Sequence, residues 1–222
     1  MGNKSLSKIT TNLKLLNGRN YIHSSTILNY LSNYFINSQD YAFEGSLDVF
    51  FRKKLNSQCY LTLTEQREED FPKKASIEFI LKVRDKKIYG YLSSSDENKK
   101  INDHYVVNDE CSNFSFFEEN FSAECNLSNS IHLYENLIAF IRKAHEFKFS
   151  KDFISIKNIV NLSVTNFPLD LFRKKKSQLK LKLKNIFSRN IEEKKIATYN
   201  EISVVSLNEI IKFEVSFLVE FE

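Results

Sequence analysis

The strongest constraint on the fold is an internal repeat. In each half of the chain, a helix-like segment is followed by several strand-like segments. In the first half, apolar residues recur at helical spacing after Ser24 and Ser25, either of which can cap a helix, so we expect a helix reaching about Asn37. In the second half the same spacing predicts a helix from Ser128 to Phe147.

Alternating apolar and polar residues predict strands around both helices. The predicted strands are 8–16, 45–51, 58–66 and 75–94 in the first half and 114–117, 153–165, 179–187 and 197–222 in the second. Segment 75–94 is long enough for a hairpin that turns at 84–86, and the last segment turns near Glu209. The polar stretch 95–110 has no period, so we predict two domains, 1–103 and 104–222.

Short local matches relate the two halves. Asn20-Tyr-Ile-His23 corresponds to Asn129-Ser-Ile-His132 at an offset of 109, and Phe51-Arg-Lys-Lys54 corresponds to Phe172-Arg-Lys-Lys175 at an offset of 121. Each match is short, but they occur in the same order and beside equivalent predicted elements. The chain is therefore interpreted as two copies of a unit of about 100 residues, expected to pack as a pseudo-dimer.

Composition excludes several classes of protein. With four glycines in 222 residues the chain carries no Gly-rich phosphate loop, and its three cysteines show no C-x-x-C spacing. We therefore expect reduced thiols, no zinc site and a cytoplasmic protein. No apolar run approaches the length of a membrane span, and the N-terminal sequence does not read as a signal peptide.

The net charge of +4 is mild, but the positive residues form two runs. One run is Arg52, Lys53 and Lys54, and the other comprises Arg173, Lys174, Lys175 and Lys176. Both are typical of solvated turns, and both also suit docking of an acidic partner. Nucleic acid is not expected as a partner, because no basic and aromatic motif of a known module occurs.

Two stretches of the first half resemble the hotdog superfamily. Gly18-Arg-Asn-Tyr-Ile-His23 is similar to the G-D-x-N-P-x-H signature of MaoC-like enoyl hydratases, with Tyr21 in place of Pro and no counterpart of the catalytic Asp. Phe51-Arg-Lys-Lys-Leu-Asn-Ser-Gln-Cys-Tyr-Leu61 resembles the F-x-x-P-L-x-x-G-D-x-L strand and turn of hotdog thioesterases and hydratases, without its Pro and Gly. The resemblance implies an α+β fold of two tandem hotdog units, each a curved antiparallel sheet wrapped around a long central helix.

The resemblance also implies a function. Proteins of this kind act on acyl thioesters in bacterial fatty-acid or polyketide biosynthesis, with the acyl group carried on the phosphopantetheine of an acidic acyl carrier protein or on coenzyme A and no other cofactor. Dehydratase or hydratase activity is the first expectation, and thioester hydrolysis or acyl transfer with decarboxylation is the alternative. A non-catalytic acyl-chain or partner-binding protein is the alternative of another class, and a lipid-binding helix-grip fold is a further one. The expected state is a monomeric pseudo-dimer or a homodimer.

His23 is the leading candidate for a catalytic residue. At the N-terminal turn of the first helix the helix dipole disfavours the imidazolium, so the ring can stay neutral and act as a base. The same position equally suits a histidine that only caps the helix. Residues expected to contact the substrate are Asn20, Tyr21, Ser24, Asn29 and Asn136.

The second helix offers the partner acid. The family resemblance places such an acid at Glu135, with His132 as the equivalent of His23. A glutamate in the first turn also simply complements the helix dipole, and that interpretation stays open. His104 and His145 receive no role.

Overall fold

The computed structural model describes residues 8–16, 21–37, 45–65, 75–94, 101, 104–105, 111–129, 133–149, 156–169, 177–207 and 209–222. The chain divides into two compact units, Met1–Val106 (unit 1) and Val107–Glu222 (unit 2), and the sequence had placed the boundary between residues 103 and 104. Within the described part of the chain, no helix combines the length and apolarity that crossing a bilayer requires.

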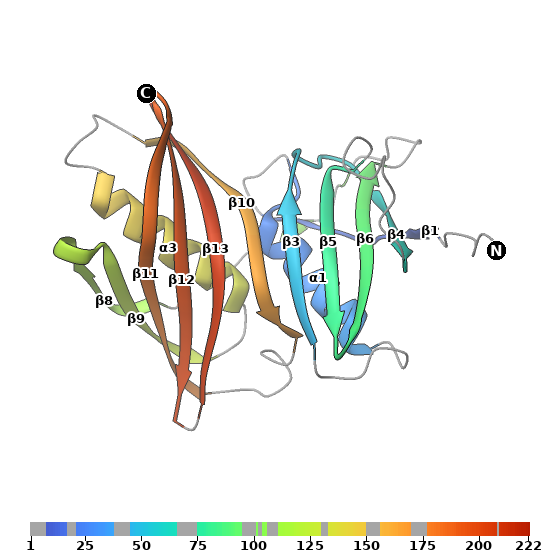
Figure 1. Cartoon of the computed structure of the whole chain (residues 1–222), viewed down its shortest axis with the longest axis horizontal. Coiled ribbons are helices and arrows are strands. Elements are labelled where there is room, and N and C mark those ends of the chain that lie inside the picture. Colours follow the sequence, from blue (N-terminus) through green and yellow to red (C-terminus); the bar gives the residue numbers. More distant parts are fainter. Residues whose placement is uncertain are drawn as a thin grey trace. The chain divides into compact units, whose positions relative to one another are not determined.

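Unit 1 packs one helix against an antiparallel sheet (Figure 1). The helix is α1 (Ser24–Asn37), and the sheet strands are β1 (Lys8–Thr10), β3 (Gly45–Phe51), β4 (Cys59–Thr64), β5 (Ile77–Val83) and β6 (Lys86–Ser94). Two short strands, β2 (Leu15–Leu16) and β7 (His104–Tyr105), form a separate parallel pair. The buried stripe of α1 includes Ile27, Leu28, Leu31 and Phe35, which confirms the predicted helix.

Unit 2 repeats this plan with longer strands (Figure 1). Its elements are β8 (Cys111–Phe117), the short 3₁₀ helix η1 (Glu118–Asn120), β9 (Ser122–Asn129), α3 (Leu133–Phe149), β10 (Ile156–Pro168), β11 (Ser177–Glu192), β12 (Lys195–Ser206) and β13 (Glu209–Phe221). Aromatic pairs fix α3 on its sheet, with Tyr134 against Phe167 at 5.1 Å and Phe149 against Phe221 at 5.6 Å between ring centroids. Such pairs contribute beyond the apolar area that they bury.

Several predicted boundaries differ from the structure, and two of these differences lie at the first strand and at the second helix. The predicted strand 8–16 is interrupted, because residues 11–14 leave the ladder between β1 and β2. The second helix begins at Leu133 and not at Ser128, because Ser128 and Asn129 belong to β9, which pairs with β11. The two helices nevertheless begin 109 residues apart, at Ser24 and Leu133, which is the offset of the first sequence match.

The two sheets differ in strand order. In unit 2 the order is β10-β13-β12-β11-β9-β8, so the last three strands of the chain form a meander. In unit 1 the order is β3-β5-β6-β4-β1, so β6 lies between β4 and β5, and the strands after α1 do not follow their chain order across the sheet. The difference lies in the orientation of the β5–β6 hairpin, which turns at Arg84 and Asp85.

One glycine in unit 1 gives an aromatic ring its space. Gly90 on β6 pairs with Phe79 on β5, and a Cβ atom at Gly90 would overlap the Phe79 ring. That ring is fully buried and meets Phe35 of α1 edge-on at 5.7 Å. The missing side chain of Gly90 thus lets Phe79 connect the sheet to the helix.

We expect Gly90→Ala to destabilise the protein by about 1–3 kcal/mol, because the rigid Phe79 ring cannot move without disturbing Phe35. Chemical denaturation of the variant measures the loss. Adding Phe79→Leu should recover part of it, so the double-mutant cycle should show coupling. If Gly90→Ala cost the same with Phe79 or with Leu at position 79, the steric explanation would be wrong.

Candidate functional site

The entry into α1 gathers residues that the sequence had assigned to different tasks. The segment before the helix is held against the loop that follows β3, because the Ile22 amide donates a 2.6 Å hydrogen bond to the Leu55 carbonyl. Beside this bond, the Lys54 ammonium lies 4.9 Å from the centroid of the Tyr21 ring. The Tyr21 ring in turn lies 6.5 Å from the His23 ring. We call Tyr21, His23, Ser25 and Lys54 the α1-entry cluster.

His23 is the residue immediately before α1, and its side chain caps the helix. Its Nδ1 accepts from the Ser25 backbone N–H at 3.4 Å and lies 2.8 Å from the Ser25 hydroxyl oxygen. Its carbonyl accepts from the Ile27 amide at 3.2 Å, as expected of a residue that opens a helix. The sequence had offered Ser24, Ser25 or His23 itself as the cap. The structure makes Ser24 the first residue of the helix and Ser25 a partner of the cap.

These bonds determine which nitrogen of His23 carries the proton. A backbone N–H can only donate, so Nδ1 holds a lone pair, and the proton of the neutral ring lies on Nε2. In this form Nε2 is a hydrogen-bond donor. The geometry therefore suits polarisation of a substrate carbonyl better than abstraction of a proton by Nε2. Ser25 is 0% exposed, so its hydroxyl is not placed to attack a substrate.

The basic run of unit 1 is not uniform. Arg52 lies 3.4 Å from Glu78, which is buried, so part of its charge is compensated. Lys53 is exposed, and Lys54 lies over Tyr21. Lys54 is thus the member of the run that belongs to the α1-entry cluster.

The other predicted site residues fall elsewhere. Asn29 is exposed on α1, where its Oδ1 accepts a 2.9 Å hydrogen bond from Asn33. Glu135 and Asn136 lie in the first turn of α3, where they are 7% and 1% exposed. Outside the described residues lie Asn20, His132, Arg173, Lys174 and Lys175.

Two groups of unit 1 are held in their neutral forms. Burial raises the pKa of Tyr30 to about 12, with smaller contributions from Cys59 and Tyr34. Burial also raises the pKa of Cys59 to about 11, although the hydrogen bond with Thr11 acts in the opposite direction. Neither group is therefore an ionised nucleophile at neutral pH. Within the described ranges, no group of His, Cys, Asp and Glu side chains is suited to hold a metal ion.

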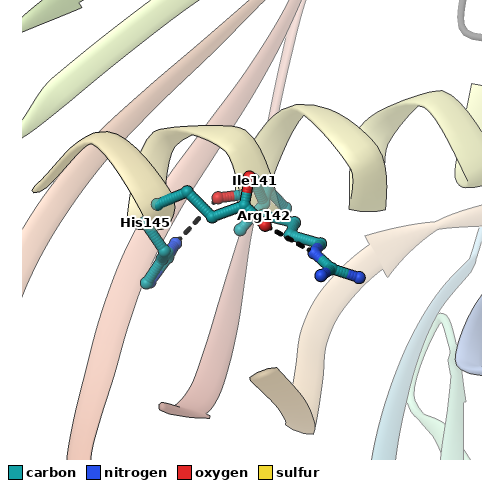
Figure 2. Close-up of polar contacts among 4 residues, drawn as sticks. Ile141, Arg142 and His145 are labelled. Carbon is teal, nitrogen blue, oxygen red and sulfur yellow. Dashed lines mark hydrogen bonds and ion pairs between the residues drawn. The ribbon is translucent and has the colours of Figure 1, made fainter. Parts of the chain in front are cut away.

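His145 is the residue that sequence reasoning missed. It lies on the buried face of α3, where its Nδ1–H donates to the Ile141 carbonyl at 2.8 Å (Figure 2). Its Nε2 accepts from the Thr198 hydroxyl at 2.7 Å. Helical spacing could have found this residue, because His145 follows Ile141 by one turn on the buried stripe. Arg142, the residue after Ile141, points to the exposed side of the helix and pairs with Glu146 (Figure 2).

A chain of hydrogen bonds continues from His145 across the sheet. The Asn200 amide donates to the Thr198 hydroxyl at 3.2 Å, and the Asn185 amide donates to the Asn200 carbonyl oxygen at 3.0 Å. The Ser188 hydroxyl donates to Asn185 at 3.2 Å and ends the chain at the exposed side. Every nitrogen of His145 has a partner, so this histidine is a satisfied core residue.

Burial lowers the pKa of His145 to about 4, while its bond to Ile141 acts weakly in the opposite direction. The unfolded chain, with an ordinary histidine pKa near 6.5, then takes up the proton first as the pH falls. His145 thus contributes stability that is full above about pH 6.5 and is lost as the pH falls toward 4.

We expect this histidine to remove about 2 kcal/mol of unfolding free energy between pH 8 and pH 5. Chemical denaturation of wild type and His145→Gln across that range measures the effect. Because other groups titrate in both proteins alike, the quantity to compare is the difference between them, which should shrink as the pH falls. A difference that stays constant from pH 8 to pH 5 would contradict the assignment.

Comparison with known proteins identifies the fold. No protein-family model matches the chain, and no curated protein matches it. Among solved structures, it is similar to a conserved hotdog-fold protein of unknown function from Alicyclobacillus acidocaldarius, with a TM-score of 0.53 and 9% identity over 98% of this chain and 96% of that one.

Two weaker likenesses are to enzymes. One is the bifunctional dehydratase-cyclase domain of ambruticin biosynthesis, with a TM-score of 0.45 and 7% identity over 91% of this chain and 82% of that one. The other is the acyl-CoA thioesterase II of Mycobacterium marinum, with a TM-score of 0.38 and 6% identity over 81% of each chain. The chain therefore has the α+β hotdog fold that the sequence predicted, and this conclusion rests on the likeness to the Alicyclobacillus protein.

Proposed function

We propose that this protein acts on an acyl thioester of coenzyme A or of an acyl carrier protein, and that the α1-entry cluster is its thioester site. The observation that carries the proposal is the convergence of Lys54, Tyr21 and His23 at one helix N-terminus. The first of these came from a basic run and the other two from a hydratase-like motif, and the fold brings them together.

The chemistry of the cluster fits a thioester. The carbonyl oxygen of a thioester gains negative charge when water adds to the conjugated double bond of an enoyl group or to the carbonyl itself. The Nε2–H of His23 and the positive end of the α1 dipole would both stabilise that charge. The Lys54 ammonium would attract the phosphates of coenzyme A or of phosphopantetheine.

Hydration or dehydration of the acyl group is the activity that we favour, with thioester hydrolysis second. Support comes from the match of Asn20 and His23 to the hydratase motif. Glu135, which the family resemblance offers as an acid, stays a prediction from the sequence. Acyl transfer with decarboxylation is the remaining catalytic alternative.

One observation favours a non-catalytic acyl-thioester binding protein as the second candidate. The lone pair of His23 Nδ1 is used to cap α1, and Gly18 and Arg19 stand where hydratases carry the catalytic Asp. A protein that binds an acyl thioester without converting it would need the hydrogen-bond donors of the α1-entry cluster but no catalytic base.

His23→Asn separates these candidates, because asparagine also caps helices but has no imidazole. For an enzyme we expect kcat to fall about 100-fold or more, with little change in KM, as for loss of one donor to a developing oxyanion. Hydration of crotonyl-CoA, dehydration of 3-hydroxybutyryl-CoA and release of free thiol from acyl-CoA are the assays. Circular dichroism and Ser25→Ala control for the helix cap. If the wild type binds these thioesters but converts none of them, the protein is the binding protein of the second candidate.

Lys54→Gln should weaken coenzyme A thioester binding by about threefold to tenfold at low salt, with the loss reduced as ionic strength rises. Lys53→Gln removes the same charge from an exposed neighbour and is the matched control. Isothermal titration calorimetry at two salt concentrations measures both variants. Equal effects of the two substitutions would show that only the net charge matters and would remove Lys54 from the site.

A further inference from the structure

Helix α1 lies on one face of the unit 1 sheet (Figure 1), and aromatic side chains gather on the opposite face. Phe79 of β5 points toward the helix, because its ring meets Phe35 of α1. Its chain neighbours Glu78 and Ile80 therefore point to the other side of the sheet. Cross-strand pairing with these two, and the alternation along β4, bring four partly exposed rings to that side: Phe50, Tyr60, Tyr89 and Tyr91. We call this side the aromatic face of unit 1.

Positive side chains accompany the rings. The Arg52 guanidinium lies 5.6 Å from the centroid of the Phe50 ring, and the Lys8 ammonium lies 5.7 Å from the centroid of the Tyr60 ring. Lys87 belongs to the same face, because it stands two positions before one of the rings on β6. Cations thus stand beside the rings of this face, on three different strands and the loop after β3.

The acids of the aromatic face are buried and paired. In the described strands of unit 1, the positions that point to this face hold two carboxylates, Asp48 and Glu78, which are 6% and 4% exposed. Asp48 pairs with Lys82 at 2.6 Å, and Glu78 pairs at 3.4 Å with the arginine described above. Lys8 and Lys87 are exposed, so the accessible charge of the face is positive.

Rings beside exposed cations fit a partner that carries both flat rings and negative charge. The bases of single-stranded nucleic acid stack on aromatic side chains, and its phosphates pair with lysine. In a duplex the bases already stack on one another, so side chains on a sheet do not reach their faces. A second copy of this face would oppose positive charge with positive charge, and a neutral carbohydrate would make no use of the lysines.

We propose that the aromatic face of unit 1 binds single-stranded nucleic acid, with bases stacked on Phe50, Tyr60 and Tyr89 and phosphates held by Lys8 and Lys87. The proposal does not rest on the proposed function, because it uses none of the α1-entry cluster. No sequence motif indicated this partner, since the rings come from three strands that are separated in the chain and meet only in the sheet.

Binding of a fluorescein-labelled oligothymidylate to the full chain, followed by fluorescence anisotropy at low salt, tests the stacking. We expect Tyr89→Leu to weaken binding by about fivefold to 100-fold, as for the loss of one stacked base. Tyr199→Leu is the matched control, because Tyr199 is an exposed sheet tyrosine of unit 2. A wild type that does not bind, that binds the duplex equally well, or that loses as much affinity with Tyr199→Leu would overturn the proposal.

The lysines give a test that leaves the packing of the sheet unchanged, even if the Tyr89 variant does not fold. Lys87→Gln should reduce the slope of log Kd against log salt by about 0.7, the value for one phosphate contact on a single strand. Lys86→Gln is the matched control, because Lys86 is also exposed but precedes Lys87 on β6 and points to the other side of the sheet. Equal changes of slope in the two variants would contradict the placement of the phosphates.

Stacking can also be observed in the wild type. The chain has ten tyrosines and no tryptophan, so its intrinsic emission comes from tyrosine. Oligothymidylate should quench part of this emission, and the quenched part should shrink in Tyr89→Leu but not in Tyr199→Leu. Binding without any quenching would overturn the stacking of bases on this face.

Discussion

The structure of both units depends on covering one apolar face of a helix with a sheet. In unit 1 the contact runs through Phe35 and Phe79, and it exists because Gly90 has no side chain. In unit 2, α3 packs against the sheet through aromatic pairs near both of its ends, and its buried side chains include His145 in the interior. Close packing leaves little room for change at such contacts, so the positions of the site residues follow from them.

Much of this architecture could be predicted from the sequence, because it follows local periodicity. Helix α1, strand β3 and the β5–β6 hairpin were predicted at nearly their observed bounds. Strand β9 was missed, because its buried residues Ala123 and Cys125 are small and give a weak alternation. The strand order of unit 1 could not be predicted, because nothing in the β5–β6 hairpin itself encodes which of its strands adjoins β3.

Only the part of the candidate site that depends on local sequence could be predicted. The motif located His23 at the start of a helix. A capping histidine and a catalytic histidine can both occupy this position, and only the hydrogen-bond partners of Nδ1 distinguish the two roles. The contact of Lys54 with Tyr21 and the contact of His145 with Thr198 are tertiary, the latter spanning 53 residues of sequence. No local sequence pattern indicates that either pair of residues is in contact.

The strand order of unit 1 has a consequence for how the chain assembles. In unit 2, β11, β12 and β13 can form from successive hairpins, which close short loops. In unit 1, β4 borders β1 and β6 and neither β3 nor β5, so only β6 joins the β1–β4 pair to the rest of the sheet. During synthesis the sheet of unit 1 is therefore complete only once β6, which ends at Ser94, has been made.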